Sequence, residues 1–180
     1  MTKTDNKRLF KAIEDNDFET IEQILRKNTD AMQVVGISNK FCRDKTPLMY
    51  AMQSGRFDLV RKFIDLGADV NARMAGGPGT HVLALAMIFG HPGSPCYKEF
   101  VEVARDLIAR GADPSVALWP ALCRYDRANG RSEMVELLIE RGADVNYRLP
   151  NGKTVQEMLK ITQHTPRVLQ LCGVTESRPE

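Results

Sequence analysis

The chain has 180 residues, of which 43% are apolar, enough for one compact domain or a short array of repeats with a continuous core. Lysine and arginine number 25 against 23 aspartates and glutamates, and the net charge of +2 gives no reason to expect nucleic-acid binding. No stretch approaches the roughly 18 apolar residues of a membrane helix, and the N-terminus MTKTDNKR lacks the apolar core of a signal peptide, so we expect a cytoplasmic protein.

Cysteine spacing argues against cross-links. The chain has four cysteines that are far apart and include no CxxC pair: Cys42, Cys96, Cys123 and Cys172. Disulfide frameworks and zinc ribbons depend on close and regular spacing, so neither is expected. We predict four free thiols.

Residues 5–28 carry the first helical pattern. Apolar residues recur at helical spacing in two runs: Leu9, Ala12 and Ile13, then Phe18, Ile21, Ile24 and Leu25. We therefore expect two short helices with a break at Asn16 and Asp17. Residues 32–40 form a longer connection, with room for an extended hairpin before the next helix.

A second pair of helices is predicted in residues 46–71, TPLMYAMQSGRFDLVRKFIDLGADVN. Thr46 is a good helix N-cap, and Pro47 suits the first helical position. Gly55 and Gly67 can adopt the left-handed conformation that ends a helix, so one helix is expected to stop at each. Such a pair cannot bury its apolar face alone, which predicts further copies stacked beside it.

Copies are marked by the tripeptide GAD, which starts at Gly67, Gly111 and Gly142. In order and spacing, residues 46–71 resemble an ankyrin repeat, whose usual form is close to TPLHxAAxxGHxxVVxxLLxxGADVN. The resemblance implies an all-α solenoid of stacked helix-turn-helix pairs with projecting loops, or fingers, between the pairs. It covers one domain, residues 1–173, with repeats near 5–36, 37–73, 74–115, 116–147 and 148–173, and leaves a disordered tail at 174–180. The first and last repeats are degenerate, as expected of terminal repeats.

The third repeat departs from the family pattern in three places. Glycines and a proline at 76–79 predict a projecting turn, and His81 replaces the capping threonine, which weakens that cap. The insertion HPGSPCYKE then separates the two helices of this repeat.

The fourth and fifth repeats are also irregular. The fourth has almost no finger, so Ser115 is the expected cap, and extra residues within CRYDRANG precede a second helix at 132–141. The fifth opens at the Asn151-Gly152 turn and has its second helix at 165–172.

Signatures of catalysis and of cofactor binding are missing from the sequence. It has no phosphate-binding P-loop, no GxSxG, no HExxH and no Cys and His at a recognised spacing. His91 and Cys96 are close in the insertion, but two residues supply only half of a tetrahedral zinc site, and His81 is expected to be structural. We therefore expect no enzyme activity, no cofactor and no metal.

The resemblance implies a different kind of function. Stacked repeats form a concave face from the fingers and the first helix of each pair, and in this family such faces usually bind proteins. Contact positions of the family fall on Arg43, Lys45, Gln53, Ser54, Arg73, Met74, Thr80, Ile88 and Phe89 in this sequence.

Four large side chains have alternative interpretations. Ile88 and Phe89 are apolar where the family usually shows solvent-facing residues, so they either contact a partner or pack beneath the adjacent insertion. Trp119 and Tyr125 are both candidate hot spots. The apolar run LWPAL favours the core for Trp119, whereas Tyr125 is kept as a candidate contact residue.

Charged residues are distributed unevenly. The basic residues Arg43, Lys45, Arg73, Arg148 and Lys153 fall on or beside fingers, while the acidic residues Glu14, Asp15, Glu133 and Glu136 lie on helices. The concave edge is therefore expected to be basic and to attract a partner with an acidic patch. The alternative is that these charges only solvate the surface.

The sequence thus favours a non-catalytic protein-binding module that is a monomer on its own. It leaves open an inhibitor or immunity protein that neutralises a toxin or enzyme, and a secreted effector that engages host proteins. Nucleic-acid binding is disfavoured, because aromatic residues are not interleaved with the basic ones and the net charge is small.

Overall fold

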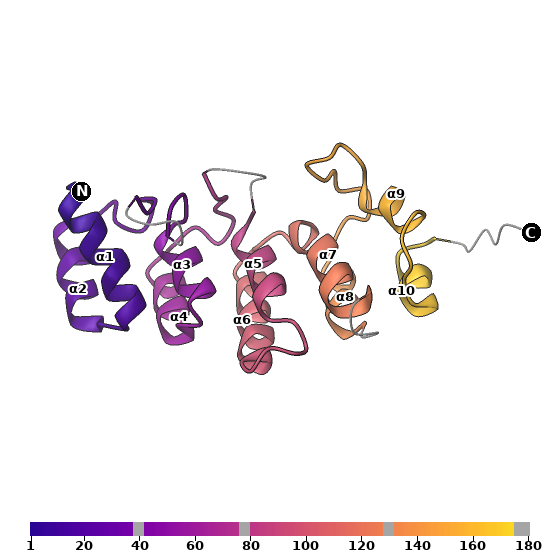
Figure 1. Cartoon of the computed structure of the whole chain (residues 1–180), viewed down its shortest axis with the longest axis horizontal. Helices are drawn as coiled ribbons and strands as arrows, with labels where there is room; N and C mark the ends of the chain where they lie inside the picture. The colour runs from indigo at the N-terminus through magenta and orange to yellow at the C-terminus, as the bar shows by residue number, and fades with distance from the viewer. Residues whose placement is uncertain (38–41, 76–79, 128–131, 175–180) are drawn as a thin grey trace, which may run out of the picture.

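Helix pairs follow one another along the long axis of the molecule (Figure 1). The computed structural model describes residues 1–37, 42–75, 80–127 and 132–174. Within these ranges the secondary structure is helical apart from isolated β-bridges, which confirms the predicted all-α solenoid. None of the helices in these ranges is long and apolar enough to cross a membrane.

Each pair has two helices, and we call the first the inner helix and the second the outer helix. The pairs are α1 (Lys3–Asp15) with α2 (Phe18–Lys27), α3 (Pro47–Gln53) with α4 (Phe57–Asp65), α5 (Val82–Phe89) with α6 (Tyr97–Ala109), α7 (Ser115–Ala121) with α8 (Glu133–Glu140), and α9 (Val155–Leu159) with α10 (Pro166–Leu171). Inner helices stack in the order α1, α3, α5 and α7, while outer helix α4 stacks on α6 and α8 on α10. Neighbouring repeats therefore bury each other's apolar faces, as in other solenoids.

Local sequence explains where the helices begin. The Thr46 hydroxyl accepts a hydrogen bond from Met49 N at 3.3 Å, with Pro47 at the first position of α3. At the start of α9, the Thr154 hydroxyl accepts from Glu157 N at 3.1 Å and the Glu157 carboxylate accepts from Thr154 N at 2.7 Å. This second bond holds the pKa of the Glu157 carboxyl below its usual value. The helix start predicted at Thr46 and Pro47 is confirmed.

The start of α7 differs from the prediction. Pro114 precedes the helix, and the Asp113 carboxylate accepts from Ser115 N at 2.9 Å, so Ser115 is the first helical residue rather than the cap. Its hydroxyl instead accepts from Asp144 N at 3.1 Å, which links α7 to the third GAD turn. His81 precedes α5 without capping it through its side chain, as the loss of threonine predicts.

The GAD turns set the spacing of successive repeats. Gly67, Gly111 and Gly142 have φ angles of 82°, 90° and 87°, in the left-handed region that glycine adopts without strain. Asn71, just after the first turn, donates to Gly111 O at 2.9 Å and accepts from Asp113 N at 2.9 Å. These two bonds join the end of one repeat to the end of the next.

The fingers are the connections that precede α3, α5 and α9, and we call them the second, third and fifth fingers after their repeats. Their described residues lie along one edge of the array (Figure 1). Isolated bridges pair residues near their bases: Gly36 with Arg43, Arg73 with His81, and Arg148 with Thr154. The described part of 32–40 holds no strand, and the predicted turn at 76–79 lies outside the described residues.

Contacts between repeats are both aromatic and ionic. Aromatic pairs join each of the first three repeats to the next: Phe10 with Tyr50, Phe57 with Phe100, and Tyr97 with Tyr125. Ion pairs join outer helices at the surface: Lys62 with Glu22, Arg61 with Glu102, Arg110 with Asp65, and Arg167 with Glu136. Because an exposed ion pair is worth up to about 1 kcal/mol, the apolar core dominates stability.

Two segments depart from regular repeats. After α7 the chain continues as a π-helix, η1 (Leu122–Arg127), which takes up extra residues predicted within CRYDRANG; residues 128–131 lie outside the described chain. The second segment is the one that follows α10. There Val174 is buried and its N–H donates to Leu169 O at 2.9 Å. Ordered packing thus extends beyond the predicted boundary at 173, while the rest of the predicted tail, 175–180, is not described.

Candidate functional site

A groove lies between α5, α7 and the fifth finger, on the face formed by the inner helices and the fingers. Its volume is about 150 Å³. Helix α5 contributes Ala84 and Ile88, and α7 contributes Val116, Trp119 and Pro120. These residues recur at helical spacing, so each helix presents an apolar side to the groove. We call this site the Trp119 groove, and the face that contains it the concave face.

The fingers complete the walls. Tyr147, Leu149 and Pro150 of the fifth finger line one side, and Thr80 and His81 of the third finger line another. His81 Nδ1 lies 3.1 Å from the backbone carbonyl oxygen that follows the first GAD turn. Since a carbonyl oxygen only accepts, Nδ1 carries a proton and donates to this oxygen.

Trp119 is supported from behind by a buried histidine. The rings of Trp119 and His164 meet edge to face, with centroids 6.3 Å apart and an interplanar angle of 64°. His164 Nδ1 lies 2.7 Å from Asp126 Oδ2, and both of these side chains are fully buried. Asp126 belongs to η1 and His164 to the loop before α10, so the pair joins the fourth repeat to the fifth.

Asp126 is the centre of a larger hydrogen-bond network. Its carboxylate also accepts from Thr165 N at 3.2 Å and from Thr165 Oγ1 at 2.5 Å. Its charge adds to burial in raising the pKa of the Cys172 thiol to about 11. Burial is the larger cause of that shift.

The network has the connectivity of a hydrolase triad but not its chemistry. Thr162 Oγ1 lies 2.9 Å from His164 Nε2, and His164 Nδ1 faces Asp126. However, the Thr162 hydroxyl donates to Met158 O at 2.7 Å, so it has no proton to give to the imidazole. The imidazole is also fully buried. This network joins the fifth repeat to the fourth and places His164 against Trp119.

Predicted contact residues of the third repeat fall in different environments. Thr80 and Ile88 line the groove, whereas Met74 and Phe89 are partly buried against the core. Ile88 and Phe89, predicted as a pair, are therefore separated by the fold: Ile88 reaches the groove and Phe89 packs inward.

The end of α3 lies outside the groove. Gln53 and Ser54 are half-buried there. The buried oxygen of the Gln53 side-chain amide has no hydrogen-bond partner among the described residues.

The two large aromatics of the fourth repeat exchange their predicted environments. Tyr125 was a candidate contact residue, but it is 0% exposed and its hydroxyl donates to Gly90 O. It also packs against Tyr97 at the start of α6, so it belongs to the core and leaves the candidate surface. Trp119, expected in the core, is only partly buried and lines the groove.

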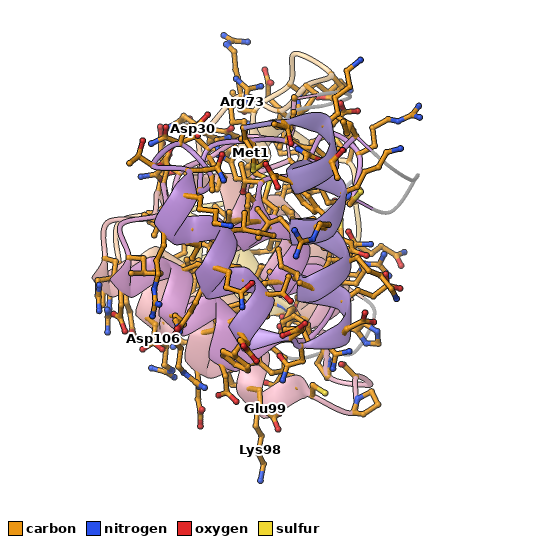
Figure 2. All side chains as sticks on the ribbon, turned by 90° about the vertical axis from the view of Figure 1, so that its left-hand side faces the viewer. Met1, Asp30, Arg73, Lys98, Glu99 and Asp106 are labelled. Atoms are coloured by element: carbon orange, nitrogen blue, oxygen red, sulfur yellow. The ribbon has the colours of Figure 1, made fainter. Side chains whose placement is uncertain are left out.

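The basic residues predicted near the fingers lie there in the structure. Arg43, Arg73, Arg148 and Lys153 are exposed, and Lys45 is half-buried. Viewed along the array, Arg73 lies at the finger edge, far from Lys98 and Glu99 at the opposite edge (Figure 2). The Arg148 guanidinium donates to Gly152 O at 2.9 Å within its own finger.

The insertion gives no sign of a metal site. His91 Nδ1 accepts from Gly93 N at 3.2 Å, which engages one of its two ring nitrogens. Within 1–37, 42–75, 80–127 and 132–174, no three His, Cys, Asp or Glu side chains are grouped as metal ligands. None of the four cysteines, all of which are described, is in a disulfide.

Two segments of the chain match models of the same kind of repeat. Residues 2–74 match a model of three ankyrin-repeat copies, and residues 121–148 match a single ankyrin repeat. Together these matches cover more than half of the chain. The chain belongs to the ankyrin repeat family. The ankyrin repeat that carries the insertion lies between the two matched segments, yet it has the same helix pair, α5 and α6.

Similar proteins include larger ankyrin proteins. The mouse ankyrin repeat and SAM domain-containing protein 6 is 31% identical over 114 residues, which are 63% of this chain and 12% of that protein. An ankyrin repeat protein of Rickettsia bellii is 33% identical over 78 residues, 43% of this chain and 11% of that protein. The mouse 2-5A-dependent ribonuclease is 32% identical over 83 residues, 44% of this chain and 10% of that protein. The chain thus spans about a tenth of these relatives' length, and what it shares with them is the ankyrin array, in general a protein–protein interaction module.

Proposed function

We propose that this chain binds a partner protein through its concave face and modulates that partner's activity, with no chemistry of its own. The observation that carries the proposal is the edge formed by the fingers, where Arg43, Arg73, Arg148 and Lys153 are exposed beside the inner helices. The inner helices beside this edge stack on one another before any partner arrives, so their part of the face loses little ordering free energy on binding.

The charge of this edge supports a partner with an acidic patch. Carboxylates in the same region are engaged in turns: Asp69 accepts from Asn71 N at 2.8 Å, and Asp144 accepts from Asn146 N at 2.8 Å. Arg43, Arg73 and Lys153 are exposed at the edge, so their cationic groups can meet a partner. Complementary charges chiefly raise the association rate and set specificity. The chain acts as a monomer in this proposal, because a solenoid needs no second copy to close its core.

The test is capture of partners from the native cell, identification by mass spectrometry, and measurement of affinity with one purified partner. Arg43→Glu with Arg73→Glu should lower that affinity at least about tenfold, since charge reversal at a complementary interface introduces repulsion. Arg26→Glu with Arg105→Glu, on outer helices α2 and α6, changes the net charge equally and should leave affinity within about twofold. Equal effects of the two pairs would refute binding at the basic edge.

A further inference from the structure

We propose that the Trp119 groove binds one large apolar side chain, aromatic or branched aliphatic, from an acidic segment of a partner protein. This inference rests on the proposed function and adds the chemistry of the segment that the concave face recognises. It is carried by the size of the groove, by the support behind Trp119 and by the charges beside the groove.

The size of the groove fits a single side chain. Its volume is about 150 Å³. A protein cavity of about this size holds a benzene molecule, so one phenyl or branched aliphatic group fills it. The lining from α5, α7 and the fifth finger is apolar apart from a few groups such as the Thr80 hydroxyl and His81 Nε2. Both residues belong to the third finger, so polar groups on that side can hydrogen-bond the backbone of the bound segment.

The wall of the groove is already ordered. Trp119 packs on His164, which Asp126 and Thr162 hold from both ring nitrogens at 2.7 and 2.9 Å. Helices α5 and α7, which supply most of the apolar lining, pack directly on each other. A preformed wall lowers the entropic cost of binding, and Trp and Tyr are the residues most often found at binding hot spots.

Basic residues stand beside the groove on two fingers. Arg73 pairs with the lining residue His81 in an antiparallel bridge, so their side chains lie on the same side of the third finger. Lys153 accepts at its carbonyl oxygen from the N–H of the lining residue Leu149 at 2.9 Å. Arg148 lies in the same finger, where it pairs with Thr154 in an antiparallel bridge. An apolar side chain flanked by carboxylates therefore complements the groove and its edge together.

The experiment selects peptides from a random displayed library on the full-length protein. We expect enrichment of peptides with one large apolar residue flanked by Asp or Glu. Binding should change the emission of Trp119, the single tryptophan of the chain. Replacing the apolar residue of a selected peptide with alanine should weaken binding to the unchanged protein at least about tenfold, which corresponds to 1.4 kcal/mol.

The protein variant Ala84→Leu adds bulk inside the groove and should weaken the same peptides at least about tenfold. Its control is Ala109→Leu, which places the same bulk at an exposed position of outer helix α6 and should leave binding unchanged. If Ala84→Leu fails to fold, the alanine-substituted peptides and Trp119 emission of the unchanged protein decide the question alone.

The outcomes separate this inference from the proposed function. Loss of binding in Arg43→Glu with Arg73→Glu, but none in Ala84→Leu or with alanine-substituted peptides, overturns the groove and leaves the basic concave face. Binding that no concave-face variant alters overturns both. The inference is also overturned if no peptides are enriched, or if the selected peptides lack acidic residues or lack a large apolar residue. It is overturned as well if the selected peptides bind without changing the emission of Trp119.

Discussion

Replacing Asp126 with alanine should open the boundary between the fourth and fifth repeats. The substitution removes the acceptor of three hydrogen bonds, from His164 Nδ1, Thr165 N and Thr165 Oγ1. Breaking a buried pair by removing one partner costs about 3–5 kcal/mol, because the remaining groups stay buried and unpaired. We expect a loss in that range for Asp126→Ala.

The isosteric change Asp126→Asn should cost less, about 1–2 kcal/mol. The amide oxygen can face His164 Nδ1 and Thr165 N, while the amide nitrogen donates to Thr165 Oγ1, so the hydrogen bonds persist and the charge is lost. Asp144→Ala is the matched control. It removes an exposed carboxylate that accepts one backbone N–H, at 2.8 Å, and should cost no more than about 1 kcal/mol.

Hydrogen exchange and urea unfolding together test where the stability is lost. In a solenoid each repeat is held chiefly by its neighbours, so Asp126→Ala should increase exchange in α9 and α10 and leave α3 and α4 close to the unchanged protein. Trp119 emission should shift at lower urea than the helical circular dichroism signal, because Trp119 packs on His164. A loss below about 1 kcal/mol for Asp126→Ala, or a uniform increase in exchange along the array, would refute the role given to this network.

Three further predictions concern single positions. Thr154→Ala removes the α9 capping box and should cost about 1 kcal/mol in urea unfolding, with faster exchange at the start of α9; an unchanged transition would contradict the capping role. Gly90→Ala would place a Cβ against Phe100 and 2.6 Å from the Ala86 carbonyl oxygen, so we expect a loss of about 1–3 kcal/mol in the same assay, and a neutral result would contradict the close packing. Burial raises the pKa of the Cys172 thiol from 9.0 to about 11, so the unfolded chain ionises first as pH rises. Stability should therefore be unaffected by this group below pH 9 and fall by about 2 kcal/mol on reaching pH 11, and the fall should be smaller in Cys172→Ala.

Capping and periodicity were legible in the sequence because they act over a few residues. The Thr46 and Thr154 hydroxyls accept hydrogen bonds from backbone N–H groups three residues later, so their capping role depends only on residues close in sequence. The GAD glycines likewise adopt left-handed φ angles for local steric reasons. From these signals the five helix pairs and most of their boundaries were predicted. Ser115 was assigned wrongly as a cap because the Asp113 carboxylate, two residues earlier, accepts from Ser115 N instead.

The candidate site was predicted only in part. Periodicity shows which side of a helix is apolar, but the apolar run around Trp119 does not say whether a neighbouring repeat covers it. In the fold, Trp119 is left partly uncovered and faces the groove. Tyr125, in contrast, is covered by the fold. It packs against Tyr97, and its hydroxyl donates to Gly90 O.

By itself the sequence determined the repeat, its helix pairs and the placement of basic residues near the fingers, because each depends on contacts within one repeat. Only the tertiary structure decided the groove and the Asp126–His164 pair behind it, whose members are 38 residues apart in two irregular segments. Neither segment has a sequence motif that predicts contact with the other. Their side chains meet because the fifth repeat stacks on the fourth, and a contact made by stacking leaves no period in the chain.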